Sequence, residues 1–246
     1  MNYQWNWKIF WEPASNGLPY WQTLVTGLLW TLTVALIAWA IALVVGTVIG
    51  VMRTTPNKWL VRIGDAWVET FRNVPLLVQM FIWYFVLPEL LPKGISDQVK
   101  QMQSYTYISA ILCLGLFTSA RVAEQVRAGI ISLPRGQGMA ATAMGLTIAE
   151  SYRYVLLPQA GRIILPPLTS EFLNIIKNSS VASVVFVVEL FGATRALQEE
   201  SFKVFEAFTA ATIIYLLVNG CVVLLMRAIE NKTRVPGLVA ASGGGH

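Results

Sequence analysis

The chain has 246 residues, of which 55% are hydrophobic and only 13% are charged, and its formal net charge is +5. A soluble domain usually carries about 25% charged residues, so this composition excludes an ordinary soluble protein. The single histidine, His246, and two cysteines within apolar runs, Cys113 and Cys221, provide no pattern for a metal site or for histidine-based catalysis.

Long apolar runs lie between clusters of charged residues. No charged residue occurs from Pro13 to Met52, and a helix needs roughly 20 mostly apolar residues to cross the hydrocarbon core of a membrane. In chain order we predict five membrane-spanning helices, at about residues 25–52, 67–90, 105–128, 178–191 and 208–226. The fourth has the least clear boundaries and follows an amphipathic segment. The predicted fold is therefore an all-α, polytopic membrane helical bundle.

Basic residues predict the orientation of these helices, because loops rich in lysine and arginine stay in the cytoplasm. The segments after the first and third predicted spans, counted with the adjoining span ends, and the C-terminal tail together hold 13 of the 18 basic residues. These are Arg53, Lys58, Arg62, Arg72, Arg121, Arg127, Arg135, Arg153, Arg162, Lys177, Arg227, Lys232 and Arg234. The N-terminus is thus predicted outside and the C-terminus inside, which fits an odd number of spans.

This topology divides the chain into three parts. Residues 1–24, rich in tryptophan, are expected along the outer membrane interface. Residues 25–227 form the transmembrane domain, and residues 228–246 form a cytoplasmic tail with a glycine-rich, disordered end. Within the first span, Gly46 and Gly50 form a GxxxG pattern, which predicts close packing against another helix.

A long connecting segment, about residues 129–177, follows the third span. It is much longer than a simple connector, and its helix-forming residues predict a structured cytoplasmic loop that has a partner. Gly136, Gly138 and Ala141 spell the dinucleotide-binding pattern GxGxxA. We reject that interpretation, because no predicted strand precedes the pattern.

This loop resembles the cytoplasmic signature of permease subunits of ATP-binding-cassette importers. The signature is Glu-Ala-Ala, three residues, Gly, nine residues, then Ile-x-Leu-Pro. Its spacing is matched by Met139-Ala140-Ala141, Gly145 and Val155-Leu156-Leu157-Pro158. Met139 stands where the family usually has Glu. The resemblance implies a helix–turn–helix that couples to a cytoplasmic ATPase through Gly136, Gln137, Ala140, Ala141, Gly145, Leu157 and Pro158.

Other motifs resemble the polar amino-acid branch of this family, over about residues 27–227. They include Glu69-Thr-Phe-Arg72-Asn73-Val-Pro75-Leu-Leu-Val-Gln79 and Asn174-x-x-Lys177-Asn178-Ser179-Ser180. The N-terminal Trp-Asn-Trp and the run Phe117-Thr-x-Ala-Arg121-Val-x-Glu124-Gln125-Val-Arg127 resemble members that import glutamate and aspartate. The resemblance implies import of polar amino acids, with glutamate and aspartate as the first choice and glutamine or general L-amino acids as alternatives.

The resemblance also implies a complex at the bacterial inner membrane. Its other parts are a second permease subunit, homologous or identical, two cytoplasmic ATPases and an external amino-acid-binding protein, surrounded by lipid and without nucleic acid. The chain contains no GxxxxGK[ST] phosphate loop. ATP and Mg²⁺ are therefore expected on the partner ATPase, and this chain is predicted to be a transport subunit rather than an enzyme or a cofactor-binding protein.

Polar residues within the predicted spans are candidates for the substrate path, because such residues rarely face lipid. The guanidinium of Arg121 could bind a substrate carboxylate; snorkelling to the inner interface, or pairing with Glu124, is the alternative. Thr118 and Gln79 are further candidates. A hydroxyl bonded to its own helix, and an amide bonded between helices, are the simpler interpretations of these two residues.

The remaining charged residues in these motifs are expected to form gating or structural pairs: Glu69 with Arg72, Glu124 with Arg127, and Glu171 and Lys177 with charges on neighbouring helices. Two other functions were weighed. An ion-coupled secondary transporter would need broken helices in inverted halves, and the sequence shows no such symmetry. A membrane-embedded enzyme would need a catalytic constellation, which the sequence also lacks.

Overall fold

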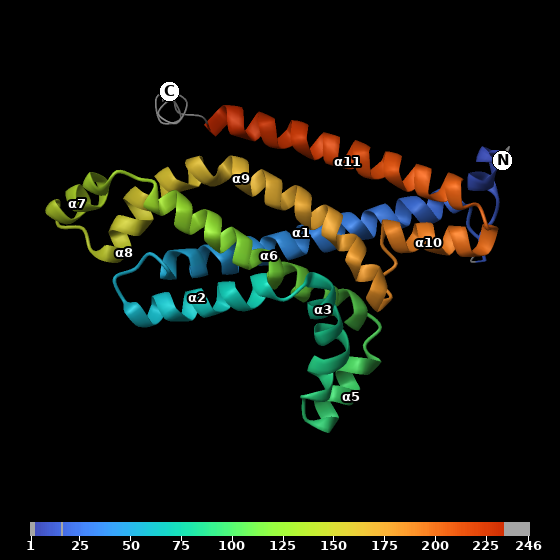
Figure 1. Ribbon diagram of the computed structural model, residues 1–246, viewed down its shortest axis with the longest axis horizontal. Coiled ribbons are helices and arrows are strands. Elements are labelled where there is room, and N and C mark those ends of the chain that lie inside the picture. The colour runs from blue at the N-terminus through green and yellow to red at the C-terminus, as the bar shows by residue number, and fades with distance from the viewer. Residues whose placement is uncertain (1–2, 16, 234–246) are drawn as a thin grey trace.

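A computed structural model describes residues 3–15 and 17–233 (Figure 1). Over these residues the regular elements are helices, and there is no β-strand. This result confirms the all-α prediction. The glycine-rich end of the predicted tail lies outside the described residues, and the last helix continues through Thr233.

Among the described residues, three helices are continuous and apolar enough to cross a membrane: α1 (Tyr20–Met52), α6 (Tyr105–Ile131) and α11 (Val204–Thr233). They confirm the predicted first, third and fifth spans. Helices α1 and α6 pack closely because of small residues. A Cβ atom added to Gly46 would lie 2.6 Å from the Cβ of Val122, and one added to Gly50 would lie 2.6 Å from the Cβ of Val126. The GxxxG pattern therefore does bring two helices together.

The second span is broken. It consists of α2 (Lys58–Asn73), α3 (Leu76–Phe81), the π-helical segment Ile82–Val86 and α4 (Leu87–Glu89), with a bend of 100° after α2. The prediction of one helix over residues 67–90 is therefore wrong. Pro75 causes the break, because proline lacks an N–H and forces the preceding residue out of the helical region. Val74 accordingly has φ −94° and ψ 126°.

The fourth span is also broken. It consists of α8 (Ile148–Glu150), the π-helical segment Ser151–Leu156, α9 (Leu157–Asn178), a 3-10 turn (Ser179–Val185) and α10 (Leu190–Ser201), with a bend of 50° before α10. The predicted span over residues 178–191 is wrong in position, because those residues hold the break. The amphipathic segment before it is the long helix. If each bent pair counts as one span, the described part of the chain has up to five.

A helical hairpin projects from one end of the bundle (Figure 1). It comprises α7 (Arg135–Ala143), α8 and the π-helical segment after α8. Residues 129–177 are thus divided between the end of α6, this hairpin and most of α9. The N-terminal segment lies at the opposite end of the bundle, where the backbone N–H of Asn6 donates to Glu206 Oε1 at 2.7 Å. We call the two ends the hairpin end and the N-terminal end.

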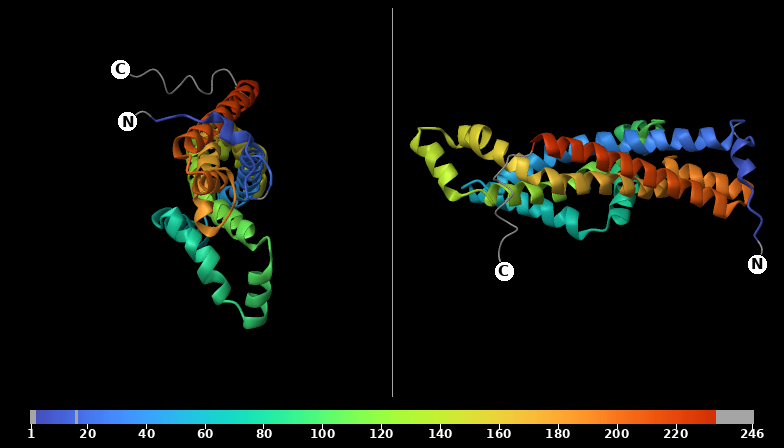
Figure 2. Two further views of the ribbon diagram at one scale, coloured as in Figure 1. Left: turned by 90° about the vertical axis from the view of Figure 1, so that its right-hand side faces the viewer. Right: turned by 90° about the horizontal axis from the view of Figure 1, so that it is seen from above.

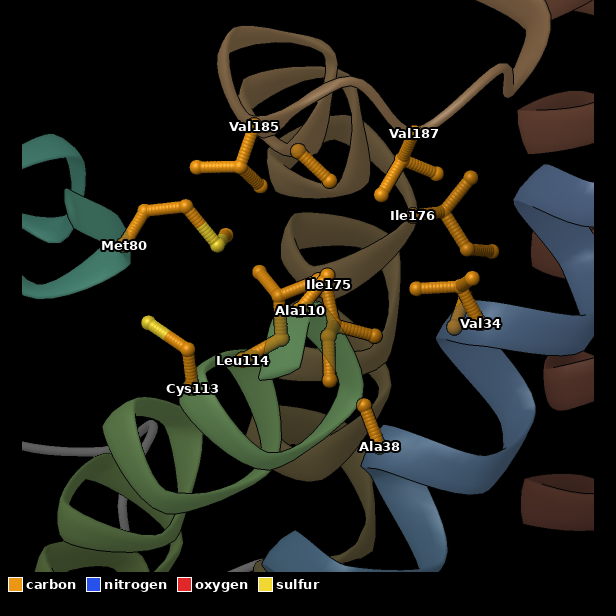
Figure 3. Close-up of a cluster of buried hydrophobic side chains, with 12 residues drawn as sticks. Val34, Ala38, Met80, Ala110, Cys113, Leu114, Ile175, Ile176, Val185 and Val187 are labelled. Atoms are coloured by element: carbon orange, nitrogen blue, oxygen red, sulfur yellow. The ribbon is translucent and has the colours of Figure 1, made fainter. Parts of the chain in front are cut away.

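The chain from α3 to α5 (Lys93–Gln101) stands out from the side of the bundle (Figures 1 and 2). Its base joins the rest through a buried apolar cluster, in which Met80 of α3 points towards Val185 at the end of the 3-10 turn (Figure 3). The other labelled members of the cluster are Val34, Ala38, Ala110, Cys113, Leu114, Ile175, Ile176 and Val187. Lipid tails are as apolar as these side chains, so the cluster stabilises the bundle by close packing rather than by removal from water.

Candidate functional site

A charged cavity of about 360 Å³ lies between α2, α6 and α9. Its lining residues are Arg72 of α2, Arg121, Glu124 and Gln125 of α6, and Glu171 of α9. Glu124 and Gln125 lie on the same side of α6 as Arg121, because they follow it by three and four positions on the helix. Four of the five were candidates from the sequence. Gln125 was missed, although its place one turn after Arg121 was a visible signal.

Arg121 faces α9 across the cavity. Its Nη1 atom is 3.8 Å from Glu171 Oε2, and its guanidinium lies 5.1 Å from the ring centre of Phe117. The alternative pair of Arg121 with Glu124 does not form among the described residues; Arg121 instead faces Glu171 on the neighbouring helix α9. A separation of 3.8 Å is too long for a hydrogen bond, so the Arg121–Glu171 pair is open.

Glu124 is held by two other arginines. Its Oε1 atom is 2.6 Å from Arg53 Nη1 and 3.5 Å from Arg72 Nη1, and Arg53 Nε donates to Asp65 Oδ1 at 2.7 Å. Gly64 makes room for this arginine, because a Cβ there would lie 2.4 Å from Arg53 Cγ. The expected pairs of Glu124 with Arg127 and of Arg72 with Glu69 are thus wrong.

This arrangement leaves two guanidinium groups available to an anion. Arg53, Arg72 and Arg121 face Asp65, Glu124 and Glu171, so the formal charges around the cavity balance. Only Arg53 makes short contacts with its partners. Arg72 and Arg121 sit in looser pairs, and a guanidinium can bind a carboxylate with two parallel hydrogen bonds. The cavity is therefore suited to a small ligand that carries carboxylate groups.

The other sequence candidates lie outside this cavity. The side-chain amide of Gln79 donates to the backbone oxygens of Phe71 and Val74, both at 2.9 Å, and so holds the bend after α2. Thr118 is buried within the bundle. Within residues 3–15 and 17–233, no ion pair involves Glu69, Arg127 or Lys177, including the pair expected for Lys177. Arg53 and Asp65 were not site candidates from the sequence, although an arginine directly after the first span was a signal.

The α7–α8 hairpin has the geometry of a helix–turn–helix. Gly145 has φ +83°, and the backbone N–H of Leu146 donates to the oxygen of Ala141 at 3.1 Å, which is the usual way to end a helix on glycine. Thr147 and Glu150 then form a capping box at the start of α8. The predicted turn between two short helices is confirmed.

The tip of the hairpin presents apolar side chains to its surroundings. Met139 is 67% exposed and Met144 is 76% exposed, while Ala141 is buried inside the hairpin. Gly136, Gln137, Ala140 and Pro158 are exposed, and Leu157 packs against a buried cluster at the base. Exposed methionines beside small residues are typical of surfaces that bind another protein.

Comparison with known proteins places these features in context. Residues 42–235 match the family model described as "Binding-protein-dependent transport system inner membrane component". The chain is 47% identical over 245 residues to the glutamate/aspartate import permease protein GltJ of Escherichia coli (strain K12), covering 96% of this chain and 98% of that protein. It is 36% identical to the probable glutamine ABC transporter permease protein GlnM of Bacillus subtilis (strain 168), covering 77% and 83%.

Solved structures share the fold. A crystal structure of an amino acid ABC transporter with histidines has a TM-score of 0.73 and 29% identity, covering 87% of this chain and 95% of that chain. An inward-facing structure of the MetNI methionine ABC transporter also has a TM-score of 0.73, with 20% identity, covering 88% and 99%.

Proposed function

The chain belongs to the family of inner membrane components of binding-protein-dependent transport systems, and from this premise we propose that it imports glutamate and aspartate into the bacterial cytoplasm. It is a permease subunit of an amino-acid importer of the ATP-binding-cassette type. Membership of this family decides against an ion-coupled secondary transporter. The observation that carries the choice of substrate is Arg121, an arginine in an open pair inside a polar cavity of the bundle.

An acidic substrate matches this cavity in charge. The side-chain carboxylate of glutamate or aspartate would bind the guanidinium of Arg121 and displace it from Glu171. Glutamine has no such carboxylate and would gain less from the cation. The similarity to GltJ, a glutamate/aspartate import permease protein, supports this assignment.

The hairpin is the proposed contact with the ATPase. In this proposal Met139, Met144 and the turn at Gly145 enter a cleft on a cytoplasmic ATP-binding subunit, which holds ATP and Mg²⁺ and performs the hydrolysis. A second permease subunit, an external amino-acid-binding protein and membrane lipid complete the assembly. The orientation follows from the basic residues, with the hairpin end in the cytoplasm.

The experiment is transport by the complete importer, reconstituted in vesicles with its partner subunits. Arg121→Gln should lower uptake of glutamate and aspartate roughly 10- to 150-fold, because a charge-assisted contact contributes about 1.5–3 kcal/mol. Arg195→Gln is the matched control, since Arg195 is exposed on α10, outside the cavity, and pairs with Glu199. Its uptake should equal that of the wild type.

The structure also supplies a test of the simpler role, in which Arg121 only balances Glu171. In that case Arg121→Gln combined with Glu171→Gln would restore glutamate uptake, because neither charge would be left alone. Restored uptake, or equal losses for glutamate and glutamine in Arg121→Gln, would contradict the proposed role of Arg121.

A further inference from the structure

The cavity contains a second group that the substrate carboxylate does not use. We propose that Glu171 accepts the α-ammonium group of the substrate, so that the cavity selects amino acids over dicarboxylates that lack an amino group. This inference rests on the proposed function and assigns a specificity-determining residue within the same site.

The first observation is an unused hydrogen-bond acceptor. The Oε2 atom of Glu171 is buried and has no hydrogen-bond partner within the described part of the chain, and the side chain is only 12% exposed. A buried carboxylate oxygen left without a donor is unfavourable, because it has lost its hydrogen bonds to water and gained none within the protein. Glu171 nevertheless lines the cavity, where a bound ligand can supply the donor.

The second observation is the contrast with Glu124, the other carboxylate of the cavity. Glu124 already receives a 2.6 Å contact from Arg53 and a 3.5 Å contact from Arg72. Within the described residues, Glu171 has a single ion pair, with Arg121 at 3.8 Å, and its buried Oε2 atom accepts no hydrogen bond. Glu124 is already neutralised by a short contact with Arg53, whereas Glu171 still offers a buried oxygen to a donor. An ammonium group carries three N–H donors and fits such a site.

The charges of an acidic amino acid complete the arrangement. Its side-chain carboxylate binds Arg121, and its α-carboxylate binds Arg72. Its ammonium group then replaces Arg121 as the partner of Glu171. No buried charge is then left without a partner. A dicarboxylate without an amino group would instead leave Glu171 beside a second carboxylate, and the two like charges would repel each other.

Ligand binding to the purified permease–ATPase complex, without the external binding protein, tests this assignment. The three probes are glutamate, glutarate, which has both carboxylates but no amino group, and glutamine, which has an amino group but one carboxylate. Titration calorimetry on the wild type should show glutamate binding more tightly than glutarate. Glu171→Gln should weaken glutamate and glutamine binding roughly 10- to 150-fold, and should leave glutarate binding unchanged or tighter.

Two further variants complete the design. Arg121→Gln should give the complementary pattern, with weaker glutamate and glutarate binding and little change for glutamine. Glu199→Gln is the matched control, because Glu199 is an exposed acid on α10 outside the cavity, and it should bind all three probes as the wild type does. If Glu171→Gln does not fold, Glu171→Asp should still prefer glutamate over glutarate, because it keeps the carboxylate.

The outcomes separate this inference from the proposed function. Equal losses of glutamate and glutarate binding in Glu171→Gln would assign Glu171 a structural role and overturn the inference. So would a wild type that binds glutarate as tightly as glutamate, or a Glu171→Asp variant without preference. A complete importer that transports glutamate while the wild-type complex binds none of the probes also overturns it, yet leaves the proposed function intact. An importer that transports no acidic amino acid overturns the proposed function itself.

Discussion

The two broken spans differ in the helix end that a buried side chain binds. In the second span it is the carboxyl end of α2, and in the fourth span it is the amino end of α10. The last carbonyl groups of a helix lack donors, and its first N–H groups lack acceptors. In a membrane, water is absent from the hydrocarbon core, so such groups must find partners within the protein. Each break in this bundle supplies the partner from one buried polar side chain.

At the first break the partner is a donor. The amide of Gln79, in the first turns of α3, reaches back to the carbonyl oxygens of Phe71 and Val74 at the end of α2. Pro75 opens the bend, and Gln79 holds it open at 100°. Gln79, a candidate for the substrate path from the sequence, therefore stabilises the backbone at the bend.

At the second break the partner is an acceptor. The carboxylate of Glu189 accepts from the backbone N–H groups of Phe191 at 2.9 Å and Gly192 at 2.8 Å. The hydroxyl of Tyr215, on α11, donates to it at 3.0 Å, and Thr31, on α1, donates at 3.3 Å. Glu189 is completely buried, so this break is tied to two continuous helices.

The side chain that can stabilise a break therefore depends on the helix end that it binds, because free carbonyl groups need a donor and free N–H groups need an acceptor. An amide suits the carboxyl end, and a carboxylate suits the amino end. Exchanging the two types of side chain should therefore damage both sites, although glutamine and glutamate have nearly the same shape. The variants below test this rule, beginning with the largest expected effect.

Removing the acceptor at the second break should have the largest effect. Glu189→Leu leaves two N–H groups and the hydroxyls of Thr31 and Tyr215 without their acceptor, at about 1–3 kcal/mol for each buried group. We expect a loss of at least about 4 kcal/mol, and little folded protein by fluorescence-detected gel filtration. Glu189→Gln keeps one acceptor oxygen and should retain part of the stability. Normal amounts of folded Glu189→Leu would contradict the role of this carboxylate.

Replacing the donor at the first break should have the next largest effect. Gln79→Glu turns a carboxylate towards two carbonyl oxygens and removes both donated hydrogen bonds. The expected loss is about 2–3 kcal/mol, measured as a lower apparent melting temperature in detergent. Gln98→Glu, at an exposed position of α5, is the matched control and should stay within about 0.5 kcal/mol of the wild type. If both variants melt alike, the amide does not hold the bend.

The two breaks also mark how far the sequence alone could predict the fold. The continuous helices depend on local length and apolarity, and all three were predicted. The first break had a local signal, the Val74–Pro75 pair, which was read as part of a longer helix. The second break had no proline or glycine to mark it, since Phe186, Val187 and Val188 are apolar. Its cause is Glu189, whose partners Thr31 and Tyr215 are distant in the chain.

The charged cavity shows the same limit at the level of side chains. Arg72, Arg121, Glu124 and Glu171 were named from the sequence, but the partners expected for Arg72 and Glu124 were wrong. Sequence spacing favours pairs three or four residues apart on one helix. The observed contacts of Glu124 instead come from α2 and from Arg53, 71 residues away. Tertiary packing decides between such partners, and one sequence does not reveal it. The hairpin was predicted better, because its glycine and capping residues act locally.

Adding a side-chain atom at the contact between α1 and α10, next to the second break, should lower stability by a smaller amount. A Cβ added to Gly27 of α1 would lie 2.8 Å from the Cβ of Ala193 and 3.0 Å from the backbone oxygen of Glu189. Gly27→Ala should therefore push α10 away from α1 and lower stability by about 1–3 kcal/mol. Gly220→Ala is the matched control, because nothing lies within 4 Å of a Cβ at this position of α11. It should be neutral or slightly stabilising. Equal melting temperatures for the two variants would show that the junction of α1 with α10 is not tightly packed.

The smallest effect, and the only expected gain, concerns the turn between the two halves of the fourth span. Phe186 has φ +67° and is 68% exposed. The left-handed region is unfavourable by roughly 1–2 kcal/mol for a residue with a side chain, and glycine adopts it freely. The Phe186 ring lies 6.1 Å from that of Tyr84, and this contact recovers only part of the strain.

Phe186→Gly should thus raise the free energy of unfolding by up to about 1 kcal/mol, seen as a higher apparent melting temperature. Phe186→Val should lower it, because a branched side chain tolerates positive φ poorly. The first break offers the internal comparison, since Val74 is extended at φ −94°. Val74→Gly relieves no strain there and should destabilise the protein. A stabilising Val74→Gly, or a Phe186→Gly variant that melts below Phe186→Val, would show that backbone strain does not distinguish the two breaks.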